Sequence, residues 1–150
     1  MIELITQFAI ASQLYTGAME KRLARHGLTL AQLSVLSHLA RVGHGGQTPL
    51  RVTQISQAVE VNQPGVTKML TKFEGAGWVR FESAPSDRRA RAAVITQQGV
   101  AHLQKVRQAL FPELGKFLAD WDEADRKDMT DHLRRLARFL DSQRTLDDKR

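Results

Sequence analysis

Cysteine is absent from this chain of 150 residues, and so are long apolar runs. The absence of cysteine excludes disulfides, thiolate nucleophiles, iron–sulfur clusters and thiol-based redox sensing. Because no run of about 18 apolar residues occurs, we expect no membrane-spanning segment. The N-terminal stretch is apolar, but Glu3 stands where a signal peptide needs a basic flank. The sequence therefore predicts a mature protein of the cytoplasm that has no membrane partner.

Catalytic and metal-binding motifs are missing as well. The chain has no glycine-rich phosphate loop and no nucleophile elbow. Its five histidines do not follow the spacing of HExxH or of other ligand sets. We therefore expect no enzymatic activity, no cofactor and no metal site. A metal-responsive regulator remains an alternative, with His38, His44 or His102 as its ligands.

Positive charge is in excess, and most of the excess lies in the middle of the chain. The formal net charge is +6. Residues 50–112 contain nine lysines and arginines and four acidic residues, so this segment contributes nine minus four, or +5. A basic centre between nearly neutral flanks suggests a polyanionic partner such as nucleic acid. The alternative is that the basic balance serves solubility alone.

Helical periodicity accounts for both ends of the chain. Length and a hydrophobic content of 42% predict one globular domain. Residues 1–27 and 100–142 are expected to form helices with broad apolar stripes, with a kink at Pro112. Thr29 is expected to cap a shorter helix, and the chain beyond Asp141 to fray. Since a monomer would expose the stripes, we expect them to bury one another in a homodimer.

The pattern of residues 53–76 predicts two helices joined by a tight turn. Ile55 and Val59 form a short apolar face. A second face follows at helical spacing and consists of Val66, Met69, Leu70 and Phe73. Either Asn62 or Gln63 caps the second helix, because Pro64 is compatible with both arrangements. The opposite face is free of acidic residues and can reach phosphates or base edges. We assign DNA contacts to Asn62, Gln63, Gly65, Thr67, Lys68, Thr71 and Lys72.

The next segment, residues 78–96, predicts a β-hairpin with a basic tip. Residues 78–83 alternate apolar and polar side chains, and residues 92–95 are expected to return to the core as a second strand. The loop between them carries one carboxylate, Asp87, beside three arginines, Arg88, Arg89 and Arg91. Thr96 is expected to cap the helix that follows.

A helix, a turn, a second helix and a basic hairpin in this order resemble the winged helix-turn-helix of the MarR (multiple antibiotic resistance regulator) family. The wing signature of that family is Asp-x-Arg, a strand and Leu-Thr. Here Asp87, Arg89 and Ile95-Thr96 match that signature, and Gly77-Trp78-Val79 matches the entry into the first wing strand. Several positions depart from the family pattern, and one of them is Ala93, which stands where a larger aliphatic residue is usual. Ser56 and Glu60 replace an alanine and a turn glycine, and Phe81 stands where a basic residue is frequent.

The resemblance implies a single domain over residues 1–150 that is mainly α with a small β-wing. Residues 28–99 would form the winged helix-turn-helix, with the helix-turn-helix at about 53–76 and the wing at about 78–96. Residues 1–27 and 100–142 would be the dimerisation helices.

The resemblance also implies a function, namely sequence-specific regulation of transcription. A homodimer would place two recognition helices in successive major grooves of a pseudo-palindromic DNA duplex. Arg89 would enter the minor groove and Asp87 would orient it, while Arg80, Arg88 and Arg91 would add DNA contacts. A small aromatic or anionic effector that relieves repression would bind near Tyr15, His38 and Arg41. A winged-helix module for architectural or protein contacts, without sequence preference, is the alternative.

Overall fold

The computed structural model describes residues 1–42, 48–84 and 87–147, with the side chains of residues 84–90 and 144–147 outside the description. The chain divides into two compact units, Met1–Leu110 and Phe111–Arg150. The division lies next to Pro112, which cannot donate a hydrogen bond to the preceding helical turn. None of the helices in the described part of the chain combines the length and the apolar character that crossing a membrane requires.

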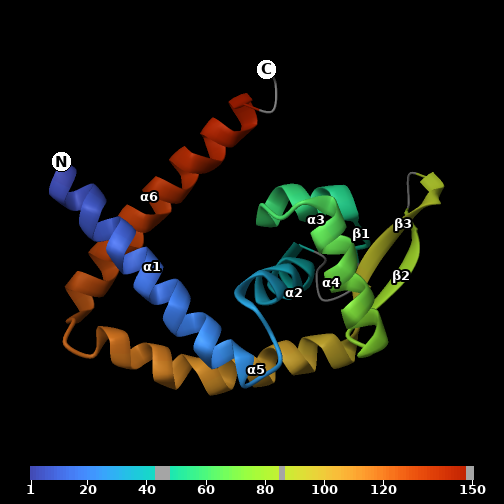
Figure 1. Cartoon of the computed structure of the whole chain (residues 1–150), viewed down its shortest axis with the longest axis horizontal. Helices are drawn as coiled ribbons and strands as arrows, with labels where there is room; N and C mark the ends of the chain where they lie inside the picture. The colour runs from blue at the N-terminus through green and yellow to red at the C-terminus, as the bar shows by residue number, and fades with distance from the viewer. Residues whose placement is uncertain (43–47, 85–86, 148–150) are drawn as a thin grey trace. The chain divides into compact units, whose positions relative to one another are not determined.

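Helices make up most of the structure, and the sheet is small (Figure 1). In chain order the elements are α1 (Ile2–Ala24), α2 (Leu30–Val42), β1 (Leu50–Arg51), α3 (Val52–Val59), α4 (Gln63–Gly75), β2 (Val79–Ala84), β3 (Asp87–Ile95), α5 (Gln97–Gly115), the 3-10 helix η1 (Lys116–Leu118) and α6 (Glu123–Asp147). This order confirms the expected class, a winged helix-turn-helix between flanking helices.

The core of the first unit lies where α2, α3 and α4 meet. The side chains of Leu36, Ile55 and Phe73, one from each helix, are completely buried. Met19 and Leu23, near the C-terminal end of α1, are buried as well, whereas residues 1–17 are exposed. The last turns of α1 are therefore fixed by the core, and its N-terminal half presents apolar side chains to solvent.

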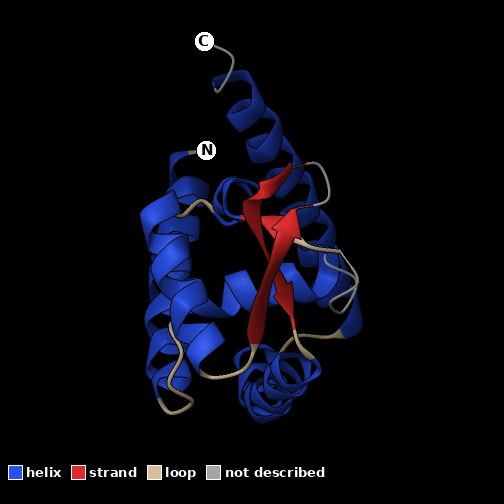
Figure 2. Ribbon diagram, turned by 90° about the vertical axis from the view of Figure 1, so that its right-hand side faces the viewer, coloured by secondary structure: helices blue, strands red, loops and turns tan. Residues whose placement is uncertain are grey.

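The sheet has three antiparallel strands in the order β1-β3-β2 (Figure 2). Central strand β3 pairs through Ala93 with Leu50 of β1 and through Ile95 with Val79 of β2. The sequence predicted two strands, with residues 84–91 as a loop between them. Instead, β3 begins at Asp87. The arginine-rich stretch pairs with β2, since Arg91 lies opposite Ser83 and Asp87 lies opposite Ala84. The two-residue strand β1 was not predicted, since it is too short to show an alternating pattern.

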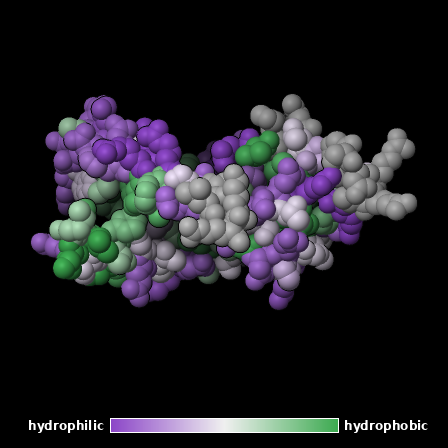
Figure 3. All heavy atoms as spheres, turned by 90° about the horizontal axis from the view of Figure 1, so that it is seen from above, coloured by the Kyte–Doolittle hydropathy of each residue, from purple (hydrophilic) through white to green (hydrophobic). Residues whose placement is uncertain are grey.

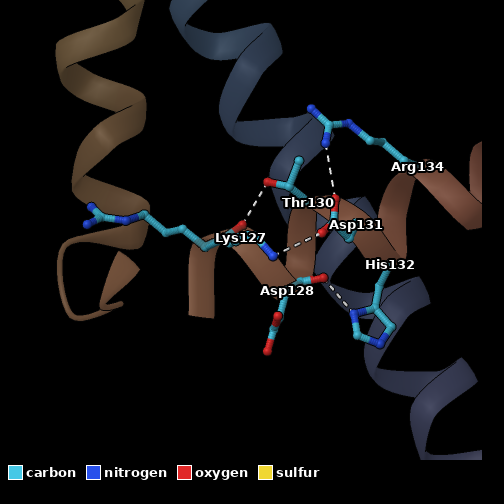
Figure 4. Close-up of polar contacts among 7 residues, drawn as sticks. Lys127, Asp128, Thr130, Asp131, His132 and Arg134 are labelled. Atoms are coloured by element: carbon cyan, nitrogen blue, oxygen red, sulfur yellow. Dashed lines mark hydrogen bonds and ion pairs between the residues drawn. The ribbon is translucent and has the colours of Figure 1, made fainter. Parts of the chain in front are cut away.

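In the second unit, polar side chains of helix α6 form hydrogen bonds and ion pairs within the helix (Figure 4). Asp122 caps it by accepting a hydrogen bond from the backbone N–H of Asp125. Asp131 pairs with Lys127 at 3.7 Å and with Arg134 at 3.1 Å. These contacts are the helical pairs expected three and four residues apart. The helix continues to Asp147, past Asp141, where the sequence predicted fraying. Helix α5 likewise runs through Pro112 to Gly115.

Hydrophobic side chains remain at the surface of both units, and green patches among hydrophilic atoms are visible in Figure 3. In the first unit they lie on α1, and in the second on the end of α5, on η1 and on α6. The exposed large apolar residues include Ile2, Leu4, Ile5, Phe8, Leu14, Phe117, Met129, Leu133, Phe139 and Leu140.

Candidate nucleic-acid interface

The turn between α3 and α4 sets the direction of α4, the second helix of the helix-turn-helix. Glu60 ends α3 in the left-handed region, with φ of 55° and ψ of 39°. A side chain in this conformation costs about 1–2 kcal/mol relative to glycine. The hydroxyl of Ser56 donates a hydrogen bond of 2.6 Å to the carbonyl of Val61 and so spans the turn. The two departures from the family pattern therefore occur together, and the Ser56 bond offsets part of the strain at Glu60.

Asn62 begins α4, which settles the choice that the sequence left open. Its Oδ1 accepts a hydrogen bond of 2.8 Å from the backbone N–H of Gly65, while Gln63 and Pro64 lie in the first turn. A Cβ on Gly65 would lie 2.9 Å from Asn62 Oδ1 and 3.0 Å from a methyl of Val61. Glycine is therefore required at position 65 so that the cap can approach the backbone closely.

Helix α4 has one buried face and one exposed face. Val66, Leu70 and Phe73 are buried, and the polar residues Gln63, Thr67, Lys68, Thr71 and Lys72 are exposed. Within the described residues Lys68 forms no hydrogen bond or ion pair. Lys72 differs, because its Nζ donates to the carbonyl of Gly27 at 2.9 Å and lies 3.3 Å from Gln32 Oε1. Lys72 thus ties α4 to the connection between α1 and α2.

Hydrogen bonds of Thr96 fix the base of the wing. The Thr96 hydroxyl donates to the carbonyl of Gly77 at 2.7 Å and accepts from the N–H of Gly99 at 3.0 Å, which confirms the expected cap. Gly77 has φ of 75°, a conformation that favours glycine. A Cβ on Gly99 would lie 2.2 Å from the carbonyl oxygen of Trp78. The run Ile95-Thr96-Gln97-Gln98-Gly99 is therefore a packing motif that joins the wing to α5.

The described basic side chains of the wing have protein partners. Arg80 pairs with Glu82, its Nη2 lying 2.7 Å from a carboxylate oxygen. Arg91 lies 4.0 Å above the centre of the Phe81 ring and 3.6 Å from a carboxylate oxygen of Glu74. The side chains of Asp87, Arg88 and Arg89 belong to the part that the structure does not describe. The expected pairing of Asp87 with Arg89 therefore stays a prediction.

Comparisons with known proteins agree with this architecture. A family model described as MarR family matches residues 26–90, from the connection after α1 into β3. The HTH-type transcriptional regulator PecS of Dickeya dadantii is 25% identical over 129 residues, covering 86% of this chain and 76% of PecS. Apo MarR from E. coli is similar in structure, with a TM-score of 0.71, 20% identity, and coverage of 89% of this chain and 96% of MarR. Over residues 26–90 the chain is therefore similar to the MarR family.

A further solved structure in this comparison contains a ligand. CouR from Rhodococcus jostii RHA1, bound to p-coumaroyl-CoA, aligns with a TM-score of 0.70 and 18% identity, covering 87% of this chain and 89% of CouR. At such low identity the similarity concerns the fold.

The three residues expected to line an effector site lie on α1 and α2. Tyr15 is about half exposed on α1, and His38 and Arg41 follow each other by one turn on α2. Burial lowers the pKa of His38, and the positive charge of Arg41 lowers it further. Within residues 1–42, no hydrogen bond or ring contact joins Tyr15 to His38 or Arg41. The structure thus brings two of the three together.

The sequence did not predict that the rings of Trp78 and His102 stack on each other. His102 of α5 stacks on Trp78, with ring centroids 3.8 Å apart, and its Nε2 is buried without a hydrogen-bond partner among the described residues. Burial lowers the pKa of His102, and the nearby His26 and Lys105 lower it further. His102 is therefore a neutral packing residue near pH 7. Across the described residues no three side chains of His, Asp or Glu are grouped as metal ligands, and His44 lies outside that part.

Proposed function

We propose that this protein, which is similar to the MarR family, is a cytoplasmic transcriptional regulator that binds double-stranded DNA in a sequence-specific manner. The observation that supports this proposal is the exposed face of α4, where Gln63, Thr67 and Lys68 point away from a completely buried apolar face. A rigid helix that presents amide, hydroxyl and ammonium groups has the chemistry for reading base edges in a major groove. The positive charge of residues 50–112 favours approach to phosphate.

The residues of this interface have different expected roles. Thr67 and Lys68 are expected to read bases, because they stand in the middle of the exposed face of α4. Arg88 and Arg89 are expected to contact the DNA backbone and the minor groove from the wing, with Asp87 orienting Arg89. Asn62, Gly65 and Gln63 stand at the N-terminus of α4, where backbone N–H groups favour phosphate.

Fluorescence anisotropy tests the proposal. The probe is a labelled duplex from the region upstream of the protein's own coding sequence, and the control is a duplex of the same composition in scrambled order. We expect a specific affinity at least about a thousandfold above the scrambled one. Arg89→Ala should weaken binding to both duplexes, whereas Thr67→Ala should change the preference between them. Equal affinity for the two duplexes would indicate an architectural module and contradict the proposal.

We further propose that the protein acts as a homodimer. The N-terminal half of α1 and the length of α6 expose large apolar side chains, among them Phe8 and Leu133 at 45% each. Exposed apolar surface of this extent is characteristic of an interface. A two-fold dimer would then present two α4 helices to half-sites about 10 base pairs apart. Light scattering at micromolar concentration is expected to give twice the mass of 16.9 kDa, and a monomeric mass would contradict the dimer.

We also propose that a small aromatic or anionic ligand relieves DNA binding, so that the protein acts as a repressor. CouR with its bound p-coumaroyl-CoA supports such a ligand by similarity of fold. Tyr15 offers an aromatic ring and Arg41 a cation. A panel of aromatic carboxylates added to the protein–DNA complex tests this idea, since an effector lowers the anisotropy and Arg41→Met weakens its action. If no member of the panel changes the anisotropy, the proposed ligand class is wrong.

A further inference from the structure

Arg91 contacts two structural elements besides its own strand. It belongs to β3, its guanidinium lies over the ring of Phe81 in β2, and its Nη2 faces the carboxylate of Glu74 in the last turn of α4. In Figure 1 the two wing strands lie beside α4. A single side chain thus joins the wing to the helix that we propose to read DNA.

The sheet register explains how Arg91 reaches Phe81. Phe81 is directly opposite Ala93, and Arg91 stands two residues before Ala93 on the same strand. Positions two residues apart share one face of a sheet, so Arg91 and Phe81 are diagonal neighbours. At this separation a long side chain reaches an aromatic ring, and the guanidinium lies 4.0 Å from the ring centroid, within the range of a cation–π contact.

The contact of Arg91 with Glu74 also pairs two opposite charges. Glu74 is the one acidic residue in the sequence of α4, and a carboxylate on a DNA-facing helix repels phosphate. Arg91 lies 3.6 Å from that carboxylate and neutralises it. The guanidinium therefore already has an anionic partner and an aromatic partner within the protein. Arg80 likewise has an anionic partner, the carboxylate of Glu82.

We propose that Arg91 is a positioning residue that clamps the wing against the end of α4 and does not itself bind phosphate. The clamp consists of Glu74, Phe81 and Arg91. This inference rests on the proposed DNA-binding function, and it revises the sequence-based assignment of Arg91 as a DNA contact. It also accounts for Phe81, which stands where the family frequently has a basic residue, because here the ring serves as the platform for Arg91.

The first experiment examines the clamp in the protein without DNA. In NMR spectra the Nε–H signal of Arg91 should be shifted upfield by the ring current of Phe81. Phe81→Leu removes the ring and should return the signal to its usual position, while Phe81→Tyr keeps the ring and should leave it shifted. An Arg91 signal at the usual position in the wild type would overturn the clamp, whatever the protein does with DNA.

The second experiment measures affinity for the upstream duplex over a series of salt concentrations. Arg91→Met should weaken binding about two- to fivefold, the effect of removing one exposed cation–π contact or ion pair. Its slope of log K against log salt should equal that of the wild type. The matched control is Arg88→Met on the same strand, whose slope should become shallower by about 0.9 for each phosphate that the variant no longer neutralises. An equally shallow slope for Arg91→Met would overturn the inference.

A double-mutant cycle completes the test. Phe81→Leu changes no charge, so a weaker affinity can arise only through Arg91 or through packing. We expect Phe81→Leu to weaken binding in the wild type and to have no further effect in Arg91→Met, because the two residues act as one unit. Additive effects of the two substitutions would contradict the clamp. If the wild type binds neither the upstream nor the scrambled duplex, the proposed function fails, and the NMR result still decides whether the clamp exists.

Discussion

Substitution of Thr96 by valine tests how the wing is attached to the rest of the fold. Valine has nearly the shape of threonine but lacks the hydroxyl. In the structure this hydroxyl donates to the carbonyl of Gly77 and accepts from the N–H of Gly99. The backbone N–H of Thr96 also donates to the carbonyl of Trp78 at 2.9 Å and is unaffected by the substitution. Thr96→Val therefore removes two hydrogen bonds and leaves the third.

The expected loss follows from these two bonds. Removing an N-cap side chain costs about 1 kcal/mol. The second bond, to the carbonyl of Gly77, contributes about 1 kcal/mol more. Thr96→Val should therefore lower the free energy of unfolding by about 2 kcal/mol. Thr96→Ser keeps both hydrogen bonds and loses one methyl group, which costs less than about 1 kcal/mol at this half-buried position.

Urea unfolding followed by circular dichroism measures both variants. Thr96→Val should shift the midpoint to lower urea with an unchanged slope, which indicates a change in stability alone. Thr96→Ser should stay close to the wild type. If serine is as destabilising as valine, the methyl group and not the hydroxyl fixes the wing. If valine is as stable as threonine, the two hydrogen bonds contribute nothing and the reasoning is refuted.

Three further substitutions probe strain, crowding and titration. Gly99→Ala should destabilise the protein by about 2–3 kcal/mol in the same urea assay, because the new Cβ would collide with the Trp78 carbonyl. Glu60→Gly should be more stable than the control Glu60→Ala by about 1 kcal/mol, since only glycine relieves the positive φ; equal stability would show that the turn is unstrained. The lowered pKa of His102 means that the unfolded chain binds its proton first, so the wild type should lose stability as the pH falls below about 6.5. His102→Phe keeps a ring against Trp78 and should lose less stability between pH 7 and pH 5; an identical pH dependence would contradict this assignment.

Sequence patterns predicted the helices well because each of them has a repeated signal. Val66, Leu70 and Phe73 recur at helical spacing, and all three are buried in α4 as expected. Thr29 precedes an apolar helix, and its side chain does accept a hydrogen bond from the N–H of Gln32. Local rules of this kind need no knowledge of the tertiary fold. Such rules were therefore enough to predict the helix-turn-helix. The order of the elements was enough to suggest the resemblance to the family.

Contacts between distant residues were beyond the reach of such patterns. Nothing in the sequence near Lys72 indicates that its ammonium meets the carbonyl of Gly27, 45 positions away. Arg91 likewise appeared as one of several basic residues, because its meeting with Glu74 depends on how the sheet lies against α4. The sequence could therefore list the basic residues of the interface but could not separate those with protein partners from those without.

The exposed helices connect folding to assembly. None of the described side chains of residues 111–143 is buried, although the stretch includes Phe117, Leu133 and Phe139. Helices in water depend on the burial of an apolar face more than on intrinsic propensity, so the intrahelical pairs of Asp131 cannot by themselves hold α6. Burial against a second copy would supply the missing stabilisation. In that case the stability of α6 depends on protein concentration, because binding of a partner stabilises the folded chain by mass action. The dimer would then be a condition for an ordered α6 as well as for the spacing of two DNA-binding helices.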